Sequence, residues 1–357
     1  MLLSLPFELV ERILRLALPD EITSTTYGER QATLRACCLV SNGLRDVAQP
    51  LLEEALLVRD YTVWDEAQET LSRLSKRLRF LWVAGRWEDK ADDFAALLSE
   101  CTALRDLRLC SWRAFDLCAL KVMSGLRRLV LDGIHLDGTI CPLPDVAELS
   151  LSYVSATCEG QQALLTPTTF PSLRHLTSTP KVFSSPLPAP SLVSSLVSVT
   201  VGETVIARDM TAYEHPSTPR LVQVYEDFLD RALWMNLCQH VEHVQILADT
   251  AYSKHARNEL LEMLADELQA RPNLPFILRL VYLPSDFSAC KCSACDACRT
   301  IARFRQACAS RGVAVETEDV DEEYGAWRGS HRFEAYAEAK KREREEGQAA
   351  AEEAPAE

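Results

Sequence analysis

The sequence predicts an α/β protein in which an N-terminal three-helix module is followed by a curved solenoid with parallel strands. A leucine pattern recurs through the chain, helix and strand signals alternate, and the first fifty residues show helical periodicity instead. The pattern reads Leu104-Arg-Asp-Leu107-Arg-Leu109 and also occurs at residues 78–83, 126–131, 146–151 and 173–177. Strands that alternate with helices pair in parallel.

The N-terminal module, residues 1–52, begins with an amphipathic helix. The apolar positions of this helix lie four and three residues apart on one face; they are Leu5, Leu9, Ile13 and Leu16. Pro6 suits a first helical turn, because its missing N–H has no intrahelical partner there. A polar linker over residues 21–29 leads to a second helix over 31–41, and a third short helix ends at Pro50.

This module resembles the F-box, and the match covers about the first fifty residues. The matching stretches are Leu5-Pro6-x-Glu8-Leu9-x-x-x-Ile13-Leu14, Cys38-Leu39-Val40-Ser41 and Ala48-Gln49-Pro50-Leu51-Leu52. An F-box followed by repeated leucines is similar to the F-box proteins with leucine-rich repeats, many fungal ones among them. In that family the helices dock on a Skp-type adaptor of a cullin (SCF-type) ubiquitin ligase complex, and the repeats present a protein substrate. The resemblance implies adaptor contacts at Leu5, Pro6, Leu9, Ile13, Leu14, Leu39 and Val40.

An alternative interpretation of the module is a plain helical cap, because the open end of a solenoid has to be covered. The chain would then be a protein-interaction scaffold outside ubiquitin transfer.

The body, residues 53–320, is expected to be an irregular leucine-rich-repeat solenoid. Successive copies of the pattern are spaced 26, 22, 20 and 27 residues apart, which is the range of such repeats. Alternate side chains of a short strand point inward, and the leucine before each strand fills the same interior. One unit cannot bury that face alone, so it stacks on its neighbour.

The second half of the body is less regular. A Pro- and Ser-rich stretch at 177–195 predicts a long loop, and residues 221–239 are expected to form a helix. Further strands and helices alternate to about residue 318. The charged tail, residues 321–357, lacks apolar periodicity and is expected to be largely disordered.

Four cysteines lie close together at Cys290, Cys292, Cys295 and Cys298. Thiolates are preferred zinc ligands, so a structural zinc ion is one interpretation. Zinc sites usually have two pairs of ligands separated by a dozen or more residues, so the favoured interpretation is a cysteine-rich turn without a cofactor.

The net charge of −14 argues against nucleic-acid binding, which depends on clustered Lys and Arg. No apolar run is long enough to cross a membrane, and the N-terminus lacks the basic residues of a secretion signal. The thirteen cysteines are therefore expected to be mostly free thiols in a cytoplasmic or nuclear protein.

The chain has no phosphate-binding loop, nucleophile elbow or zinc-protease motif, so we expect a non-catalytic subunit. The positions between the motif leucines are expected to be exposed and to contact the substrate. Besides Glu148, they are mostly basic, namely Arg105, Arg108, Arg127, Arg128 and Arg174. A basic strip there favours an acidic partner, whose identity the sequence does not give.

Overall fold

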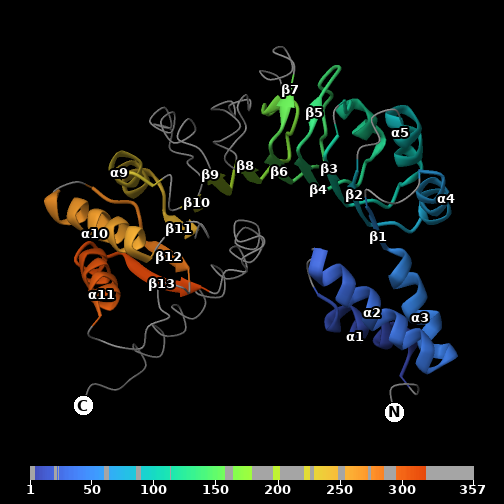
Figure 1. The fold of residues 1–357 in the computed structure, drawn as a ribbon, viewed down its shortest axis with the longest axis horizontal. Helices are drawn as coiled ribbons and strands as arrows, with labels where there is room; N and C mark the ends of the chain where they lie inside the picture. The colour runs from blue at the N-terminus through green and yellow to red at the C-terminus, as the bar shows by residue number, and fades with distance from the viewer. Residues whose placement is uncertain are drawn as a thin grey trace, which may run out of the picture. The chain divides into compact units, whose positions relative to one another are not determined.

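The structure is a computed structural model. It describes residues 5–19, 22, 24–59, 64–85, 90–112, 114–156, 164–178, 196–201, 221–225, 229–247, 254–271, 275–284 and 295–318. The described residues form two compact units, the first ending at Ser172 and the second beginning at Leu173. Both units are α/β, as Figure 1 shows, and every strand pairing that is described is parallel. The predicted α/β class is confirmed.

Three helices begin the first unit: α1 (Phe7–Ala17), α2 (Ser24–Val40) and α3 (Asn42–Glu53). They pack on one another around a small apolar core made of Leu18, Leu34, Cys38, Ala48 and Leu51. The prediction of a three-helix module is confirmed. Its helices differ in extent from the sequence-based expectation.

The second helix begins at Ser24, where the sequence had predicted a polar linker. Arg30 lies in this added part, is 7% exposed, and donates from Nη2 to the Leu51 carbonyl at 3.0 Å. A tertiary contact of this kind stabilises helical turns that have weak intrinsic propensity. Pro50 also lies inside α3 instead of ending it. The missing N–H removes one helical bond, while Leu51, which is 1% exposed, holds the last turn against the core.

Five strands of the first unit follow one another in the order β1-β2-β3-β4-β6. Their bounds are Ala55–Val58, Phe80–Ala84, Asp106–Cys110, Arg128–Asp132 and Glu148–Ser152. The register aligns Leu81, Leu107, Leu129 and Leu149 in one row, and each of them is at most 2% exposed. The leucines just before the strands, such as Leu104, are also buried, as the pattern predicted.

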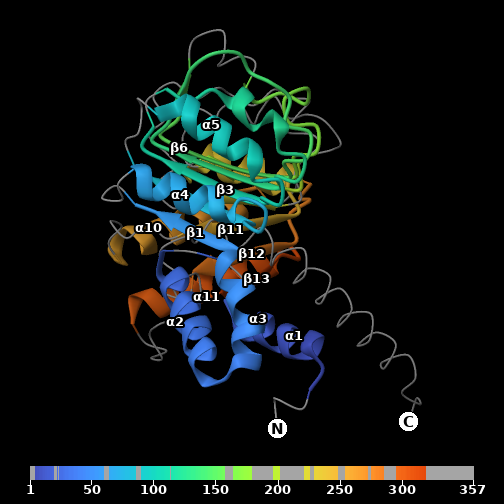
Figure 2. The ribbon, with the colours of Figure 1, turned by 90° about the vertical axis from the view of Figure 1, so that its right-hand side faces the viewer.

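Helices and short strands lie between and after these β-strands. They are α4 (Trp64–Leu74), α5 (Ala91–Glu100), the 3-10 helix η3 (Leu117–Val122), β5 (His135–Leu136) and β7 (Ser155–Ala156). Figure 2 shows α4 and α5 side by side along one side of the strands, where α5 also contacts η3. These segments also carry buried apolar side chains, for example Phe94 of α5 and Leu117 of η3.

Six strands are described in the second unit, in the order β8-β9-β10-β11-β12-β13. Their bounds are His175–Ser178, Ser198–Val201, Leu221–Tyr225, His243–Leu247, Leu280–Pro284 and Ala314–Glu318. Its described helices are α9 (Arg231–His240), α10 (Lys254–Ala270) and α11 (Asp296–Ala309), which Figure 1 shows grouped beside β11 to β13. Trp234 and Phe304 are fully buried between them.

The prediction of a helix over residues 221–239 is wrong in its first part. Leu221–Tyr225 is the strand β10, and α9 begins only at Arg231. The β-branched and aromatic residues of Leu-Val-Gln-Val-Tyr suit a strand. Asp230 then caps α9 by accepting from the Leu233 N–H at 2.7 Å.

Candidate interaction surface

Helix α1 is apolar over two adjoining faces, and the other described residues cover only one of them. Val10 is 6% exposed, and Leu14 packs against the three-helix core. Leu9, Ile13 and Leu16 follow one another at spacings of four and three on the other face, and they are 47%, 42% and 76% exposed. Exposed leucines and isoleucines in one stripe are the usual mark of a surface that binds a partner.

Two further residues of the predicted adaptor contact, Leu5 and Pro6, lie at the N-terminal end of α1. Pro6 occupies the N-cap position with a φ of −53°, and its carbonyl accepts from the N–H groups of Leu9 and Val10. Leu5, just before it, is 38% exposed. Proline therefore sets the first turn of the helix without using a donor that the helix needs.

A second exposed apolar pair ends α2, at Leu39 (83% exposed) and Val40 (70% exposed). The next residue, Ser41, caps α3 by accepting from the Leu44 N–H at 3.1 Å. The chain therefore turns sharply here, and Leu39 and Val40 stay outside the core that Leu34 and Cys38 enter.

The seven predicted adaptor contacts thus divide into six exposed residues and one core residue. Leu5, Pro6, Leu9, Ile13, Leu39 and Val40 are exposed, whereas Leu14 is partly buried against the helical core. Among the described residues, ten large hydrophobic side chains are exposed, and seven of them lie between positions 5 and 40. The concentration of these side chains singles out the helical module as the candidate interaction surface.

A strong ion pair fixes the orientation of α1. Arg15 donates from Nη1 and Nη2 to the two carboxylate oxygens of Glu54, at 2.8 Å and 2.6 Å, and from Nε to Glu11 at 2.9 Å. The hydrogen bonds to Glu54 raise the pKa of Arg15 above its ordinary value. Since Glu54 follows α3 directly, α1 is held against α3 and presents its exposed face in one orientation.

The arginines predicted to contact a substrate do not form one exposed strip. Arg105, Arg127 and Arg174 are exposed, as expected. The expected exposure is wrong for Arg108, which is 3% exposed, and for Glu148, which is 7% exposed, and the side chain of Arg128 is only 11% exposed. Alternation in a strand tells which side a residue faces, but it does not tell whether that side is covered.

The buried arginines belong to a charged row across three neighbouring strands. Asp106, Arg128 and Glu148 are direct partners in the register of β3, β4 and β6. Arg128 donates to Asp106 at 3.2 Å and lies 3.9 Å from Glu148. Opposite charges in adjacent strands stabilise a parallel sheet, so this row serves cohesion between the strands.

Arg108 adds aromatic contacts to this row. Its guanidinium lies 5.3 Å from the ring centre of Phe80 and 5.6 Å from that of Trp82, both on β2. Its Nε is 3.7 Å from Asp106. A cation held over two rings and beside a carboxylate stabilises the local packing.

Only two of the four cysteines of the zinc interpretation are within the described residues. Cys290 and Cys292 lie outside them, while Cys295 is the N-cap of α11 and Cys298 lies in its first turn, both half-buried. The described part of the chain contains no group of three or more potential metal ligands. The predicted loop at 177–195 and the tail at 321–357 also lie mainly or wholly outside the described residues.

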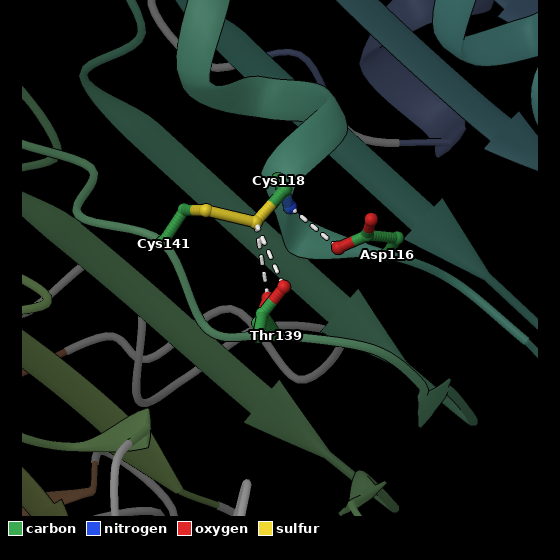
Figure 3. Close-up of a disulfide and its surroundings, with 4 residues drawn as sticks. All are labelled: Asp116, Cys118, Thr139 and Cys141. Carbon is green, nitrogen blue, oxygen red and sulfur yellow. Dashed lines mark hydrogen bonds between the residues drawn. A yellow bond between two sulfur atoms is a disulfide. The ribbon is translucent and has the colours of Figure 1, made fainter.

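One covalent link was not expected from the sequence. Cys118 in η3 and Cys141 form a disulfide with an S–S distance of 2.02 Å, shown in Figure 3. Asp116 accepts from the backbone N–H of Cys118 at 2.8 Å, and the Thr139 carbonyl lies 3.1 Å from the Cys118 sulfur. The prediction of mostly free thiols therefore fails for this pair, because chain spacing does not reveal which cysteines meet in space.

Other cysteines behave as the sequence suggested. Cys101, Cys238 and Cys308 are buried free thiols, and burial raises the pKa of Cys101 to about 11. A thiol with so high a pKa stays protonated at neutral pH and is a poor nucleophile. These three side chains act as small apolar core residues.

No helix within the described residues is long and apolar enough to cross a membrane. No protein-family model matches the chain, and the search of curated proteins likewise finds no match.

Proposed function

We propose that this protein is a substrate-recognition subunit of a cullin (SCF-type) ubiquitin ligase in the cytoplasm or nucleus. In this proposal the helices α1 to α3 are an F-box that binds a Skp-type adaptor. The parallel strands are a leucine-rich-repeat solenoid that binds a protein substrate. The chain positions the substrate and carries out no bond chemistry.

The observation that carries this proposal is the exposed apolar face of α1, formed by Leu9, Ile13 and Leu16. Covering these side chains with a partner removes apolar surface from water, which is favourable by about 25 cal/mol per Å². The Leu5-Pro6 start of the helix and the exposed pair at Leu39 and Val40 support the same interpretation, because the F-box resemblance implies adaptor contacts at these positions.

The repeated local geometry supports the solenoid part of the proposal. Buried leucines precede β2, β3 and β4, and the residue after β3, β4 and β6 has a positive φ each time: Ser111, Gly133 and Tyr153. The same turn recurs although the residue changes, as expected for stacked structural repeats.

Adaptor capture tests the proposal. Leu9→Asp together with Ile13→Asp should reduce recovery of a purified Skp-type adaptor at least tenfold, because docking would bury two carboxylates without partners. Val122→Asp with Ile277→Asp is the matched control, since these side chains are 59% and 49% exposed and lie outside the helical module. Circular dichroism checks that both double variants fold. Equal adaptor recovery by wild type and the Leu9→Asp, Ile13→Asp variant would contradict the proposal.

A capping role for the helices is the second candidate, and one contact favours it. Arg77, just before β2, forms an ion pair with Glu53, the last residue of α3. The last helix is therefore joined to the strand region that follows it. If capping is its only role, removal of residues 1–50 should cause aggregation, and the adaptor should not bind the intact protein.

A further inference from the structure

Three arginines occupy the same place on three consecutive strands of the first unit. Arg79, Arg105 and Arg127 each follow a buried leucine and stand next to β2, β3 and β4. The Arg105 N–H donates to the Arg79 carbonyl at 2.8 Å, and the Arg127 N–H donates to the Arg105 carbonyl at 2.8 Å. Neighbouring strands lie about 4.8 Å apart, so these residues form a column. We call Arg79, Arg105 and Arg127 the arginine ladder.

The side chains of the arginine ladder are exposed, although the leucines beside them are not. The side chains of Arg79 and Arg127 are 49% and 61% exposed, and Arg105 is exposed as well. Packing requires a leucine at each preceding position, but it does not require a cation at the next one. Three like charges on adjacent strands repel one another, so the arrangement gains when an anion binds across it.

Nearby carboxylates leave most of the donors of the ladder available. Arg79 lies 3.6 Å from Glu54, whose two oxygens already accept from Arg15 at 2.6 Å and 2.8 Å. Arg127 donates from Nη1 to the Asp145 carbonyl at 3.5 Å and lies 3.9 Å from the Asp145 carboxylate. Exposed pairs at such distances contribute little. Arg105 makes no side-chain hydrogen bond or ion pair with the residues that the structure describes.

We infer that the arginine ladder binds an acidic segment of the substrate protein, a run of about three or four Asp or Glu residues. This inference rests on the proposed function, in which the strands present the substrate. The outer arginines are about 10 Å apart, and an extended peptide advances about 3.3 Å per residue, so such a run spans the column. The planar guanidinium groups match carboxylates in pairs of parallel hydrogen bonds.

An acidic peptide fits better than a nucleic acid. The whole chain carries a net charge of −14. A long polyanion extends beyond the three arginines, and the negative charge elsewhere on the chain repels that part of it. A short acidic segment meets only the column itself. At physiological salt, exposed charges more than about 8 Å apart are largely screened. The carboxylates elsewhere on the chain therefore repel a short acidic segment only weakly.

Fluorescence anisotropy with a labelled octaglutamate peptide and the full chain tests the inference. The variant Arg79→Gln, Arg105→Gln, Arg127→Gln should raise the Kd at least about tenfold, as expected from the loss of three exposed ion pairs. The variant Arg35→Gln, Arg73→Gln, Arg305→Gln removes the same charge from exposed positions elsewhere and should change the Kd less than twofold. Arg105→Gln alone breaks no described side-chain contact and should raise the Kd about threefold, which guards against misfolding of the triple variant.

Several results would overturn the inference. The inference fails if wild type does not bind octaglutamate or if the ladder and control variants lose the same affinity for it. It also fails if either of two rival probes binds more tightly than octaglutamate. The rivals are a single-stranded oligonucleotide and a peptide in which one phosphoserine stands among glutamines. Adaptor capture by the ladder variant is measured in parallel. If the ladder variant still captures the adaptor but no longer binds the peptide, the inference is supported. Loss of adaptor capture by the Leu9→Asp, Ile13→Asp variant tests only the adaptor contact.

Discussion

Arg15 and Glu54 form a two-point ion pair that joins α1 to the end of α3, with distances of 2.8 Å and 2.6 Å. The Glu54 side chain is 13% exposed and that of Arg15 is 36% exposed, so the pair lies at the margin of the core. The pair therefore holds α1 against α3 and fixes the direction in which the exposed apolar face of α1 points.

We expect Arg15→Gln to lower the free energy of unfolding by about 1 kcal/mol, a value reduced for the exposure of the guanidinium. A double-mutant cycle with Glu54→Gln, followed by urea denaturation, isolates the coupling between the two side chains. Arg12→Gln changes an exposed arginine on the same helix and should leave stability unchanged within about 0.5 kcal/mol. A coupling energy near zero would contradict the anchoring role of the pair.

The turn after β4 gives a prediction about backbone conformation. Gly133 has a φ of +63°, and a Cβ added there would meet no atom closer than 3.6 Å. Gly133→Ala should therefore cost about 1 kcal/mol through its left-handed backbone alone. Thermal or chemical denaturation measures this cost.

The control for Gly133 is Gly125→Ala. Gly125 lacks a positive φ, and an added Cβ would lie 3.5 Å from the Leu104 carbonyl oxygen, an ordinary contact. This substitution should be neutral or slightly stabilising, because alanine restricts the unfolded chain. Equal destabilisation by both substitutions would contradict the conformational explanation.

The sequence predicted the parts of the fold that depend on alternation and helical spacing. The row of Leu81, Leu107, Leu129 and Leu149 was predictable because a strand places every second side chain in the interior. The apolar stripe of α1 was also predictable from its spacing, whereas its exposure was implied only by the F-box resemblance. In both cases the signal is local in the chain.

Other features depend on neighbours that are distant in sequence. Arg108 is buried because Phe80 and Trp82 of β2, which are distant in sequence, lie against its guanidinium. The sequence predicts a helix where β10 lies, because five residues are too few to separate the strand and helix periodicities. Tertiary packing decides these positions, so pattern alone does not determine them.

Asp132, at the end of β4, gives a prediction about pH. Burial raises the pKa of this carboxyl above its ordinary value of 3.8. The unfolded chain therefore loses the proton at a lower pH than the folded protein does. Ionisation of Asp132 consequently favours unfolding, and its destabilising effect grows as the pH rises from about 3.8 through the folded-state pKa.

We expect Asp132→Asn to raise the free energy of unfolding at pH 7 relative to wild type. The difference should shrink as the pH falls and disappear below about 3.8, where the carboxyl is protonated in both states. Urea denaturation from pH 3 to pH 7 measures it. Asp46→Asn, at an exposed position of α3, is the control. A gain that is the same at pH 3 and pH 7 would rule out the titration of Asp132 as its cause.

The disulfide between Cys118 and Cys141 links η3 to the segment between β5 and β6, and 23 residues separate the two cysteines. A cross-link over a loop of this length restricts the unfolded chain and typically contributes about 3 kcal/mol to stability. Both cysteines are half-buried, so a reductant can reach them. Dithiothreitol should therefore lower the urea midpoint of the wild-type protein. Cys118→Ser with Cys141→Ser should lower it to a similar extent, and dithiothreitol should then have no further effect on this double variant. If reduction leaves the wild-type midpoint unchanged, the link does not constrain the unfolded chain, and the contacts of η3 with α5 hold this region without it.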